Sequence, residues 1–235
     1  MRTRLVGHEA IADALDAGHP VRVILAPRDR TKDEEALVAR AVAAGASLWA
    51  GSDGDRFRMS PGEPARLLAM VGPPPTAEGV GDLLARPGAI WVLDGAAYPS
   101  NVGFAIRTAE VSGAAGLVVG ASFSRAQRSR ARHVSMGAWR LLPVLYASTE
   151  EVVSAARGAG RAVVAIEDAG AVAPWEADLA GDVVLILGNE RDGLGAGVLA
   201  AADVVVRIPM RGFVPSYNLQ AAMTAIAAER LRQLG

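Results

Sequence analysis

The chain has 235 residues, which suffices for one large domain or for a small domain and a medium one. Hydrophobic residues make up 51% and charged residues 21%, so we expect a packed core and exclude wholesale disorder. The formal net charge is −1, so any contact with nucleic acid requires a local basic patch. The lack of cysteine excludes disulfides, thiolate metal sites and a cysteine nucleophile, and the three histidines are too scattered to predict a metal site.

The first residues lack the pattern of a secretory signal, because His8, Glu9 and Asp13 interrupt any apolar stretch there. Nowhere does the sequence approach the run of ~20 apolar residues that a membrane helix needs. We therefore expect a cytoplasmic protein with no membrane partner.

Residues 1–72 are predicted to form a small α/β domain. Two segments repeat apolar residues at helical spacing, and the second has acidic residues in its first turn and Gly45 as its stop. Apolar runs of strand length alternate with these segments. In chain order we expect a helix at 7–18, a strand at 21–27, a helix at 33–45, and strands at 46–51 and 65–72.

Residues 73–87 are predicted to be an interdomain linker. Three consecutive prolines at 73–75 cannot continue a helix or a central strand, and the glycines around them relax the backbone. The alternative is a long surface loop within one domain, which the strong patterns on both sides disfavour.

Residues 88–235 are predicted to form a larger α/β domain around a parallel sheet. Its strand-like runs are rich in β-branched residues without strict polar alternation, which is typical of strands covered on both faces. Helical segments separate several of them. The expected strands are 89–94, 116–120, 142–146, 161–167, 182–188 and 203–209. Ligands of such sheets bind beyond the carboxyl ends of the strands, and three of these ends carry unusual residues.

The first unusual strand end is LDGAAYPSNVGFAIRTAEVSG. A strand is expected to end at Asp94 and a helix to start near Asn101, with Asn101 as its cap. Gly103 permits another backbone to come close, and Arg107 lies one and a half turns into the helix. Taken alone, an ordinary strand-turn-helix with a surface arginine is the better interpretation.

The second is LILGNERDGLG, a glycine-rich turn after a buried run. It lacks the Gly-Lys-Ser/Thr ending of a P-loop and the spacing of a dinucleotide fingerprint. Glu190 would face whatever the turn holds, although a solvated turn residue is the simpler alternative. Taken alone, this signal is weak.

The third is IPMRGFVPSYNLQ. Pro209, Gly212 and Pro215 keep the chain out of regular structure, and Ser216 and Asn218 offer side-chain caps for a C-terminal helix. Exposed backbone amides in this segment are suited to bind the edge of an adenine or a carboxylate group. A simple capped helix is the alternative.

Together and in this order, the three segments resemble the motifs of the SpoU (TrmH) branch of the SPOUT methyltransferases. The resemblance runs through residues 89–235 and includes the intermediate VSMGAWRLLPV. The N-terminal residues resemble, more loosely, the small RNA-substrate-binding domain of that family. By itself the pattern of strands and helices predicts a doubly wound sheet, because sequence rules treat knots as nearly excluded.

The resemblance implies a homodimer that transfers methyl from S-adenosyl-L-methionine to a ribose 2′-hydroxyl of rRNA or tRNA. It also implies a C-terminal trefoil knot and needs no metal. The cofactor would contact Leu187, Gly188, Asn189, Gly193, Ile208, Pro209, Met210, Ser216, Tyr217, Asn218 and Leu219. Gly188 would leave room for the adenosine, and Ile208 and Leu219 would sandwich its adenine.

The residues that match the family's polar active-site positions are Asn101, Arg107, Glu190, Ser216 and Asn218. A guanidinium has no free acceptor while charged, so we expect Arg107 to bind phosphate and stabilise the developing alkoxide rather than to act as a general base. The chain departs from the family at Tyr98, where aspartate is usual, and at Tyr217 and Gln220.

Positive charge for RNA is concentrated in one part of the chain. Between Val111 and Thr149 there is no Asp or Glu, and the basic residues include His133 and Arg140. A solvated basic loop is the alternative. The candidate RNA-binding residues are Arg28, Arg30, Arg107, Arg125, Arg128, Arg130 and Arg132, with Lys32 extending the first group.

The leading interpretation is an S-adenosylmethionine-dependent RNA 2′-O-ribose methyltransferase. Because a separate N-terminal domain is present, we favour rRNA over tRNA as the substrate. The alternative from another class is an RNA-binding module of the same fold that lacks catalysis, which the presence of all the polar active-site residues disfavours. A dehydrogenase is set aside, because the glycine fingerprint is absent.

Overall fold

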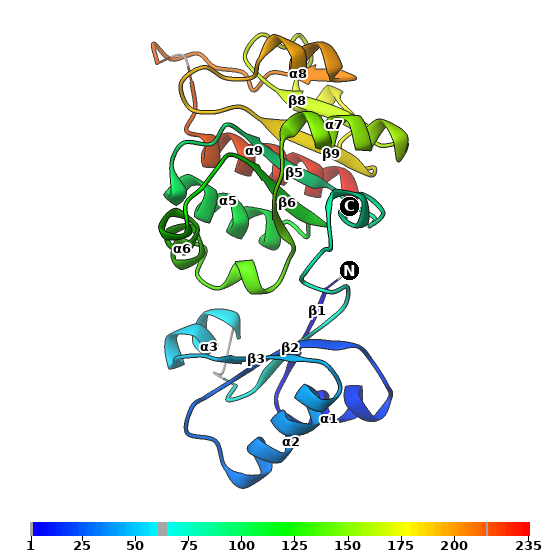
Figure 1. Cartoon of the computed structure of the whole chain (residues 1–235), viewed down its shortest axis with the longest axis vertical. Helices are drawn as coiled ribbons and strands as arrows, with labels where there is room; N and C mark the ends of the chain where they lie inside the picture. The colour runs from blue at the N-terminus through cyan, green and yellow to red at the C-terminus, as the bar shows by residue number, and fades with distance from the viewer. Residues whose placement is uncertain (1, 61–64, 215) are drawn as a thin grey trace. The chain divides into compact units, whose positions relative to one another are not determined.

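The computed structural model describes residues 2–60, 65–214 and 216–235, so Pro215 of the third motif lies outside the described residues. The chain forms two compact units, Met1–Pro75 and Thr76–Gly235 (Figure 1). Each unit has its own sheet and is described by itself.

The first unit is an α/β layer with a four-stranded sheet in the order β1-β4-β2-β3. Strands β2 and β3 are parallel, and β4 is antiparallel to both of its neighbours. The expected helices and strands are present, but the sequence did not predict β1 or α3. The elements are β1 (Thr3–Val6), α1 (His8–Asp16), β2 (Val21–Ala26), α2 (Lys32–Ala43), β3 (Ser47–Ala50), α3 (Asp53–Met59) and β4 (Leu68–Val71).

A capping box starts α2. The Thr31 hydroxyl accepts a hydrogen bond from the Glu34 amide at 3.2 Å, and the Glu34 carboxylate accepts one from the Thr31 amide at 2.8 Å. Arg66 donates to the same carboxylate at 2.6 and 3.1 Å, which ties α2 to the chain just before β4. The hydrogen bond from Arg66 is the main reason why the pKa of Glu34 falls to about 2.

The second unit is built on a six-stranded sheet in the order β10-β8-β9-β5-β6-β7. Every neighbouring pair is parallel, which confirms the predicted parallel α/β sheet. The strands are β5 (Ile90–Asp94), β6 (Gly116–Gly120), β7 (Val144–Tyr146), β8 (Ala162–Ile166), β9 (Val183–Leu187) and β10 (Val204–Val206).

Helices cover both faces of this sheet (Figure 1). Trp91 and Leu93 point into a core shared with α5 and α9, whereas Ile90 and Val92 point into a core shared with α4, α7 and α8. The α-helices are α4 (Val80–Leu84), α5 (Pro99–Val111), α6 (Arg125–Val134), α7 (Thr149–Gly158), α8 (Ala196–Ala201) and α9 (Leu219–Leu234), with short 3₁₀ helices η1 (Ala138–Arg140) and η2 (Pro174–Glu176).

The stretch expected to be a linker has two parts. Its prolines end the first unit, but from Thr76 onward it belongs to the second unit and contains α4. Leu83 and Leu84 of α4 are buried against the sheet, so this half of the stretch contributes to the core.

Two buried arginines fix the edge of the sheet where the strands begin. Arg161 donates to the backbone carbonyls of Leu84 at 2.7 Å and Gly88 at 2.8 Å, and Arg230 of α9 donates to the carbonyls of Leu179 and Gly181. Burial lowers the pKa of both guanidinium groups. These contacts supply hydrogen-bond donors to backbone oxygens at the end of α4 and in the loops before β5 and β9.

The low pKa of Glu34 predicts an acid-dependent loss of stability in the first unit. Because the folded pKa, about 2, is below the ordinary value of 4.5, this stabilisation is complete above pH 4.5 and disappears as the pH falls toward 2. Glu34→Gln should cost about 1 kcal/mol at pH 7, since half-exposed Arg66 is partly screened.

Amide hydrogen exchange in α2 tests this prediction. Protection in the variant should depend less on pH between 4.5 and 2 than in the wild type, whereas Glu9→Gln on the exposed side of α1 should behave as wild type. Identical pH dependence in the Glu34→Gln protein would contradict the assignment.

Candidate functional site

A cavity of about 540 Å³ lies at the edge of the second sheet where β8 and β9 end. This is the edge at which open parallel sheets bind ligands. The walls come from the ends of these two strands, the turn after β9, and the irregular segment before α9. The lining residues are Ile166, Glu167, Asp168, Leu187, Gly188, Asn189, Glu190, Arg191, Asp192, Gly193, Ile208, Met210, Ser216, Tyr217, Asn218, Leu219 and Ala222.

The turn after β9 is held by the side chain of Asn189. Its carboxamide oxygen accepts hydrogen bonds from the amides of Arg191 at 2.9 Å and Asp192 at 2.8 Å. The Gly193 amide returns to the Asn189 carbonyl at 3.3 Å, and Gly193 has φ +65°, which favours glycine. The predicted glycine-rich turn is therefore a closed loop on one side of the cavity.

Gly188 is required by the turn itself. A Cβ at this position would lie 2.3 Å from the Gly193 carbonyl carbon and 2.6 Å from the Leu194 amide nitrogen. Both are backbone atoms, so no side-chain movement can make room. We expected room for adenosine as the reason for this glycine, and the chain supplies a second reason.

Glu167, directly after β8, supports the turn from the neighbouring strand. This role was not predicted from the sequence. One carboxylate oxygen accepts from the Leu194 amide at 2.8 Å and the other from the Asp168 amide at 3.1 Å. A Cβ at Gly193 would lie 2.5 Å from that first oxygen. The available signal was an acidic residue directly after a buried strand at a ligand-binding edge.

Glu190 joins the turn to the start of α5. Its carboxylate accepts a hydrogen bond from the Asn101 side chain and a long one, at 3.4 Å, from the Ala97 amide. The expectation that Asn101 caps α5 was wrong. The helix already begins at Pro99, whose fixed φ suits a first helical position, and Tyr98 occupies the cap position without a side-chain bond.

Tyr98, the departure from the family pattern, lies at the same junction and is 46% exposed. Its hydroxyl interacts with the Arg191 guanidinium, which raises the pKa of Arg191. Residues of the first and second motifs therefore contact each other twice, through Asn101 with Glu190 and through Tyr98 with Arg191.

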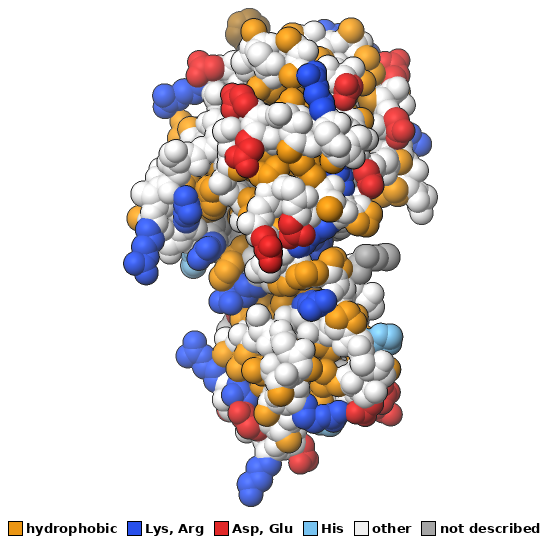
Figure 2. All heavy atoms as spheres, turned by 45° about the vertical axis from the view of Figure 1, so that its right-hand side comes forward, with side chains coloured by type: hydrophobic (Ala, Val, Ile, Leu, Met, Phe, Trp, Pro, Cys, Tyr) orange, Lys and Arg blue, Asp and Glu red, His pale blue; other side chains and the backbone are white. Residues whose placement is uncertain are grey.

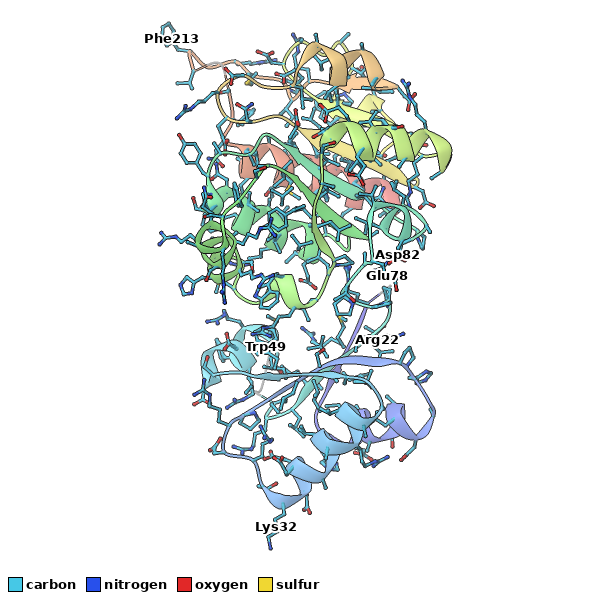
Figure 3. All side chains as sticks on the ribbon, viewed as in Figure 1. Arg22, Lys32, Trp49, Glu78, Asp82 and Phe213 are labelled. Atoms are coloured by element: carbon cyan, nitrogen blue, oxygen red, sulfur yellow. The ribbon has the colours of Figure 1, made fainter. Side chains whose placement is uncertain are left out.

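The segment between β10 and α9 is irregular in its described part, as predicted, and gives the cavity its apolar side. Leu219 is buried, and Ile208 packs against the main core while also lining the cavity. Pro209 is not among the lining residues; its carbonyl accepts a hydrogen bond from the Tyr217 hydroxyl at 3.3 Å. Phe213 extends away from the unit (Figure 3) and is fully exposed.

Asn218 is the N-cap of α9, as predicted, and its side-chain oxygen accepts from the Gln220 amide at 3.0 Å. Ser216 lines the cavity two residues before the cap, so the expectation that it helps to cap the helix was wrong. A serine there adds a hydroxyl to the cavity wall instead.

Arg107 does not line the cavity of its own chain. It is exposed on α5, and its guanidinium donates to the Met136 sulfur at 3.1 Å, beyond the end of α6. The structure thus brings Asn101, Glu190, Ser216 and Asn218 to one region, whereas Arg107 is not among the residues that line the cavity.

The basic residues between Val111 and Thr149 lie mainly on a helix rather than on a loop. The side chains of Arg125, Arg128, Arg130 and Arg132 are exposed on α6. Figure 2 shows Lys and Arg side chains gathered on the part of the second unit where α6 lies. We call these four arginines the α6 arginines.

In the first unit the candidate RNA-binding residues differ in availability. Arg28 is exposed, and Lys32 extends outward from the start of α2 (Figure 3). Arg30 is only 16% exposed, since its guanidinium pairs with Glu35 and donates to the Pro27 carbonyl at 2.9 Å. Arg30 is therefore the weakest of these candidates.

Two features are absent from the described part of the chain. Its His, Asp and Glu side chains form no group of three that would hold a metal ion. None of its helices combines the length and apolar character needed to cross a bilayer.

Known proteins resemble the chain over different lengths. A 23S rRNA (guanosine-2′-O-)-methyltransferase of Pseudomonas syringae pv. tomato is 31% identical over 148 residues, which are 63% of this chain and 59% of that protein, so the chain spans less than two thirds of this relative. A 23S rRNA (uridine(2479)-2′-O)-methyltransferase of Streptomyces viridochromogenes is 30% identical over 97% of this chain and 82% of its own length.

A solved structure shares the whole fold. The crystal structure of an AdoMet-bound rRNA methyltransferase from Sinorhizobium meliloti is 26% identical, with a TM-score of 0.65 over 100% of this chain and 88% of that one. Residues 88–228, which contain the cavity and all three motifs, match the SpoU rRNA Methylase family. The chain therefore belongs to the SpoU rRNA Methylase family.

Proposed function

We propose that this protein transfers methyl from S-adenosyl-L-methionine to a ribose 2′-hydroxyl of RNA, in the cytoplasm. The observation that carries the proposal is the cavity at the carboxyl edge of the sheet, whose walls are the second and third family motifs. Its volume of about 540 Å³ lies within the range of small-molecule sites. The AdoMet-bound relative from Sinorhizobium meliloti supports the choice of cofactor.

The cavity has an apolar surface and an acidic surface, and each matches a different part of the cofactor. Leu187, Ile208 and Leu219 offer apolar surface for an adenine, whose burial contributes most of the affinity. Glu167, Asp168 and Asp192 add negative charge, which favours a ligand that carries a sulfonium and an ammonium group. When bound, S-adenosylmethionine supplies an activated methyl group with its own leaving group.

The protein has to position the ribose 2′-hydroxyl and stabilise the negative charge that develops on its oxygen. The Glu190 carboxylate, held by Asn101, and the Ser216 hydroxyl provide polar groups at the rim for orienting a ribose. Arg107 binds a phosphate next to the target nucleotide and stabilises the alkoxide, with the proton passing to water or to a phosphate oxygen. No resident metal takes part.

Ribosomal RNA is the proposed substrate. The Streptomyces viridochromogenes relative, whose name specifies 23S rRNA, matches both units of this chain, as does the rRNA methyltransferase from Sinorhizobium meliloti. The first unit would then serve as an RNA-substrate-binding domain through Arg28 and Lys32, which are exposed. Transfer to tRNA, or RNA binding without transfer, are the outcomes that would replace this proposal.

A trefoil knot is also proposed for the second unit. The segment that leads from β10 to α9 lines the same cavity as the turn after β9, as the closely packed loops of a knot would. Family membership supports the knot as well. An experimental structure with this segment outside the preceding loop would contradict it.

A homodimer is proposed because α5 and α9 keep apolar side chains exposed. Phe104 and Val111 on α5 are 45% and 72% exposed, and Leu231 and Leu234 on α9 are 47% and 54% exposed. Ile226 of α9, by contrast, is buried in its own chain and is not available for a subunit contact. A C₂ dimer through these helices would bring Arg107 of one chain to the cavity of the other.

Methyl transfer tests the proposed activity. Purified protein incubated with 23S rRNA and deuterated-methyl S-adenosylmethionine should yield nucleosides labelled on the ribose 2′-oxygen, measured by mass spectrometry. Arg107→Ala should lower the rate about 10²- to 10³-fold, because the developing charge loses its cation. Arg157→Ala on α7 is the control, and labelled bases, labelled tRNA alone, or an active Arg107→Ala protein would refute the assignment.

Subunit mixing tests whether the site is shared. Arg107→Ala and Asn218→Ala chains should each be inactive, and exchange between them should restore about half of the wild-type activity per heterodimer, since one of its two sites is intact. Chains that carry both substitutions, mixed with Arg107→Ala chains, provide the control without an intact site. Confirmed exchange without rescue would place both residues in one chain's site.

A further inference from the structure

The α6 arginines form a group of positive charges in a stretch of chain that has no acidic residue. The sequence has no Asp or Glu between Val111 and Thr149. In the described part of the chain, the ion pairs within 4.0 Å join other side chains and include none of the four. Such a group of guanidinium ions is stable only because it is solvated, and it gains energy when it binds an anion.

Two of these arginines each lie over an aromatic ring, a contact that favours one orientation of the guanidinium group. The Arg128 guanidinium is 4.0 Å from the ring centre of Tyr146, and the Arg132 guanidinium is 4.6 Å from that of Trp139. Arg128 also donates through Nε to the Phe123 carbonyl at 3.0 Å. A ring covers one flat face of a guanidinium, so the N–H groups at its edge, apart from Arg128 Nε, are available to an oxyanion.

Arg128 and Arg132 are four residues apart, so they lie on the same side of α6. The side chains of Arg125 and Arg130 have no such ring contact in the described structure. The helix therefore carries an oriented pair of arginines, Arg128 and Arg132, and two arginines without a ring contact. Ordering a long side chain in advance removes an entropic cost from binding.

The backbone of α6 is fixed against the helix that carries Arg107. A Cβ at Gly103 of α5 would lie 2.6 Å from the Ala131 carbonyl oxygen and 2.6 Å from the Val134 side chain. The prediction that Gly103 permits another backbone to come close is confirmed. The position of the oriented pair relative to α5 is thus set by direct helix contact.

A strained turn after α6 brings the second aromatic ring back to the helix. Met136 has φ +53°, unusual for a residue with a side chain, and Gly137 has φ +90°. The chain then enters η1, which presents Trp139 to Arg132. Because Arg107 contacts Met136 and Arg132 lies over Trp139, the proposed catalytic arginine and one member of the oriented pair are connected to the same turn.

We propose that Arg128 and Arg132, held on the rings of Tyr146 and Trp139, form a pre-oriented clamp for phosphates of the substrate RNA. The clamp aligns the RNA strand with Arg107, and Tyr146 and Trp139 act as positioning residues that never touch the RNA. The inference rests on the proposed RNA methyltransferase function. RNA is favoured over an acidic protein because paired guanidinium edges match phosphate oxygens and because Arg107 requires RNA at this turn.

The experiment separates charge from orientation. Arg128→Gln and Arg132→Gln each remove one charge, whereas Tyr146→Leu and Trp139→Leu keep every charge and remove only a ring. Arg157→Gln on α7 is the matched control. Binding of in vitro transcribed 23S rRNA is measured across a range of salt concentrations, with thermal unfolding and S-adenosylmethionine calorimetry as checks on folding.

The two kinds of variant should differ in a defined way. Each Gln variant should reduce the slope of log K against log salt by about 0.7 to 0.9, the loss of one phosphate contact. Each Leu variant should keep the slope and weaken binding by about two- to fivefold, the contribution of one cation–π contact to the clamp. Trp139→Leu also removes the ring under Arg140, whose guanidinium is 4.5 Å from the ring centre. Trp139→Phe retains a ring and should bind the RNA more tightly than Trp139→Leu. This comparison separates loss of the ring from misfolding as the cause of weaker binding.

Several results would overturn the clamp. If wild-type protein methylates RNA while both Gln variants keep normal affinity and slope, the function stands and the clamp is wrong. If the Gln variants lose binding to polyglutamate but not to RNA, the surface serves an acidic protein. If wild-type protein binds cofactor but transfers no methyl group, the proposed function has failed instead.

Discussion

The candidate site depends on one steric constraint, the lack of room for a side chain at Gly188. Because a Cβ there would overlap the backbone of Gly193 and Leu194, the chain can fold back on itself directly after β9. Gly193 is confined in turn by the Glu167 carboxylate from the neighbouring strand. The turn is thus held by contacts within the chain itself, and forming it in advance lowers the entropic cost of binding.

The two edges of the second sheet have different roles. At the edge where the strands begin, Arg161 and Arg230 are buried and donate hydrogen bonds to backbone carbonyls of the surrounding segments. At the edge where strands end, Glu167 and Glu190 bind loops together but leave the cavity open. The buried arginines thus lie at one edge and the cavity lies at the other, the edge where open parallel sheets bind ligands.

The fold was predictable where the pattern was repetitive. The β-branched runs of the second unit predicted a parallel sheet, and all of its neighbouring pairs are parallel. In the first unit β1 was missed, since TRLV is a short segment with two polar residues and little burial. Short helices such as α3 and α4 have too few residues to show a period, so tertiary contacts decide them.

The site was only partly predictable, for reasons that are local. The roles of Gly103 and Asn218 were predicted correctly. The close packing of α6 on Gly103 and the cap of α9 by Asn218 each depend mainly on the type of that one residue. Asn101 was misassigned, since Pro99 starts the helix earlier than the asparagine implies. Glu167 had no motif to mark it, and its role arises from a strand that is adjacent in space but distant in sequence.

Calorimetric titration of S-adenosylmethionine into the wild type and Gly188→Val tests the central claim, that the crowded turn after β9 forms the cofactor cavity. The wild type should bind one cofactor per chain, and the variant should lose binding at least about 100-fold, because valine displaces the turn from the cavity wall. Gly197→Ala, in the open space of α8, should bind normally. A folded wild type that binds no cofactor, or a Gly188→Val protein that binds it as tightly, would contradict the account.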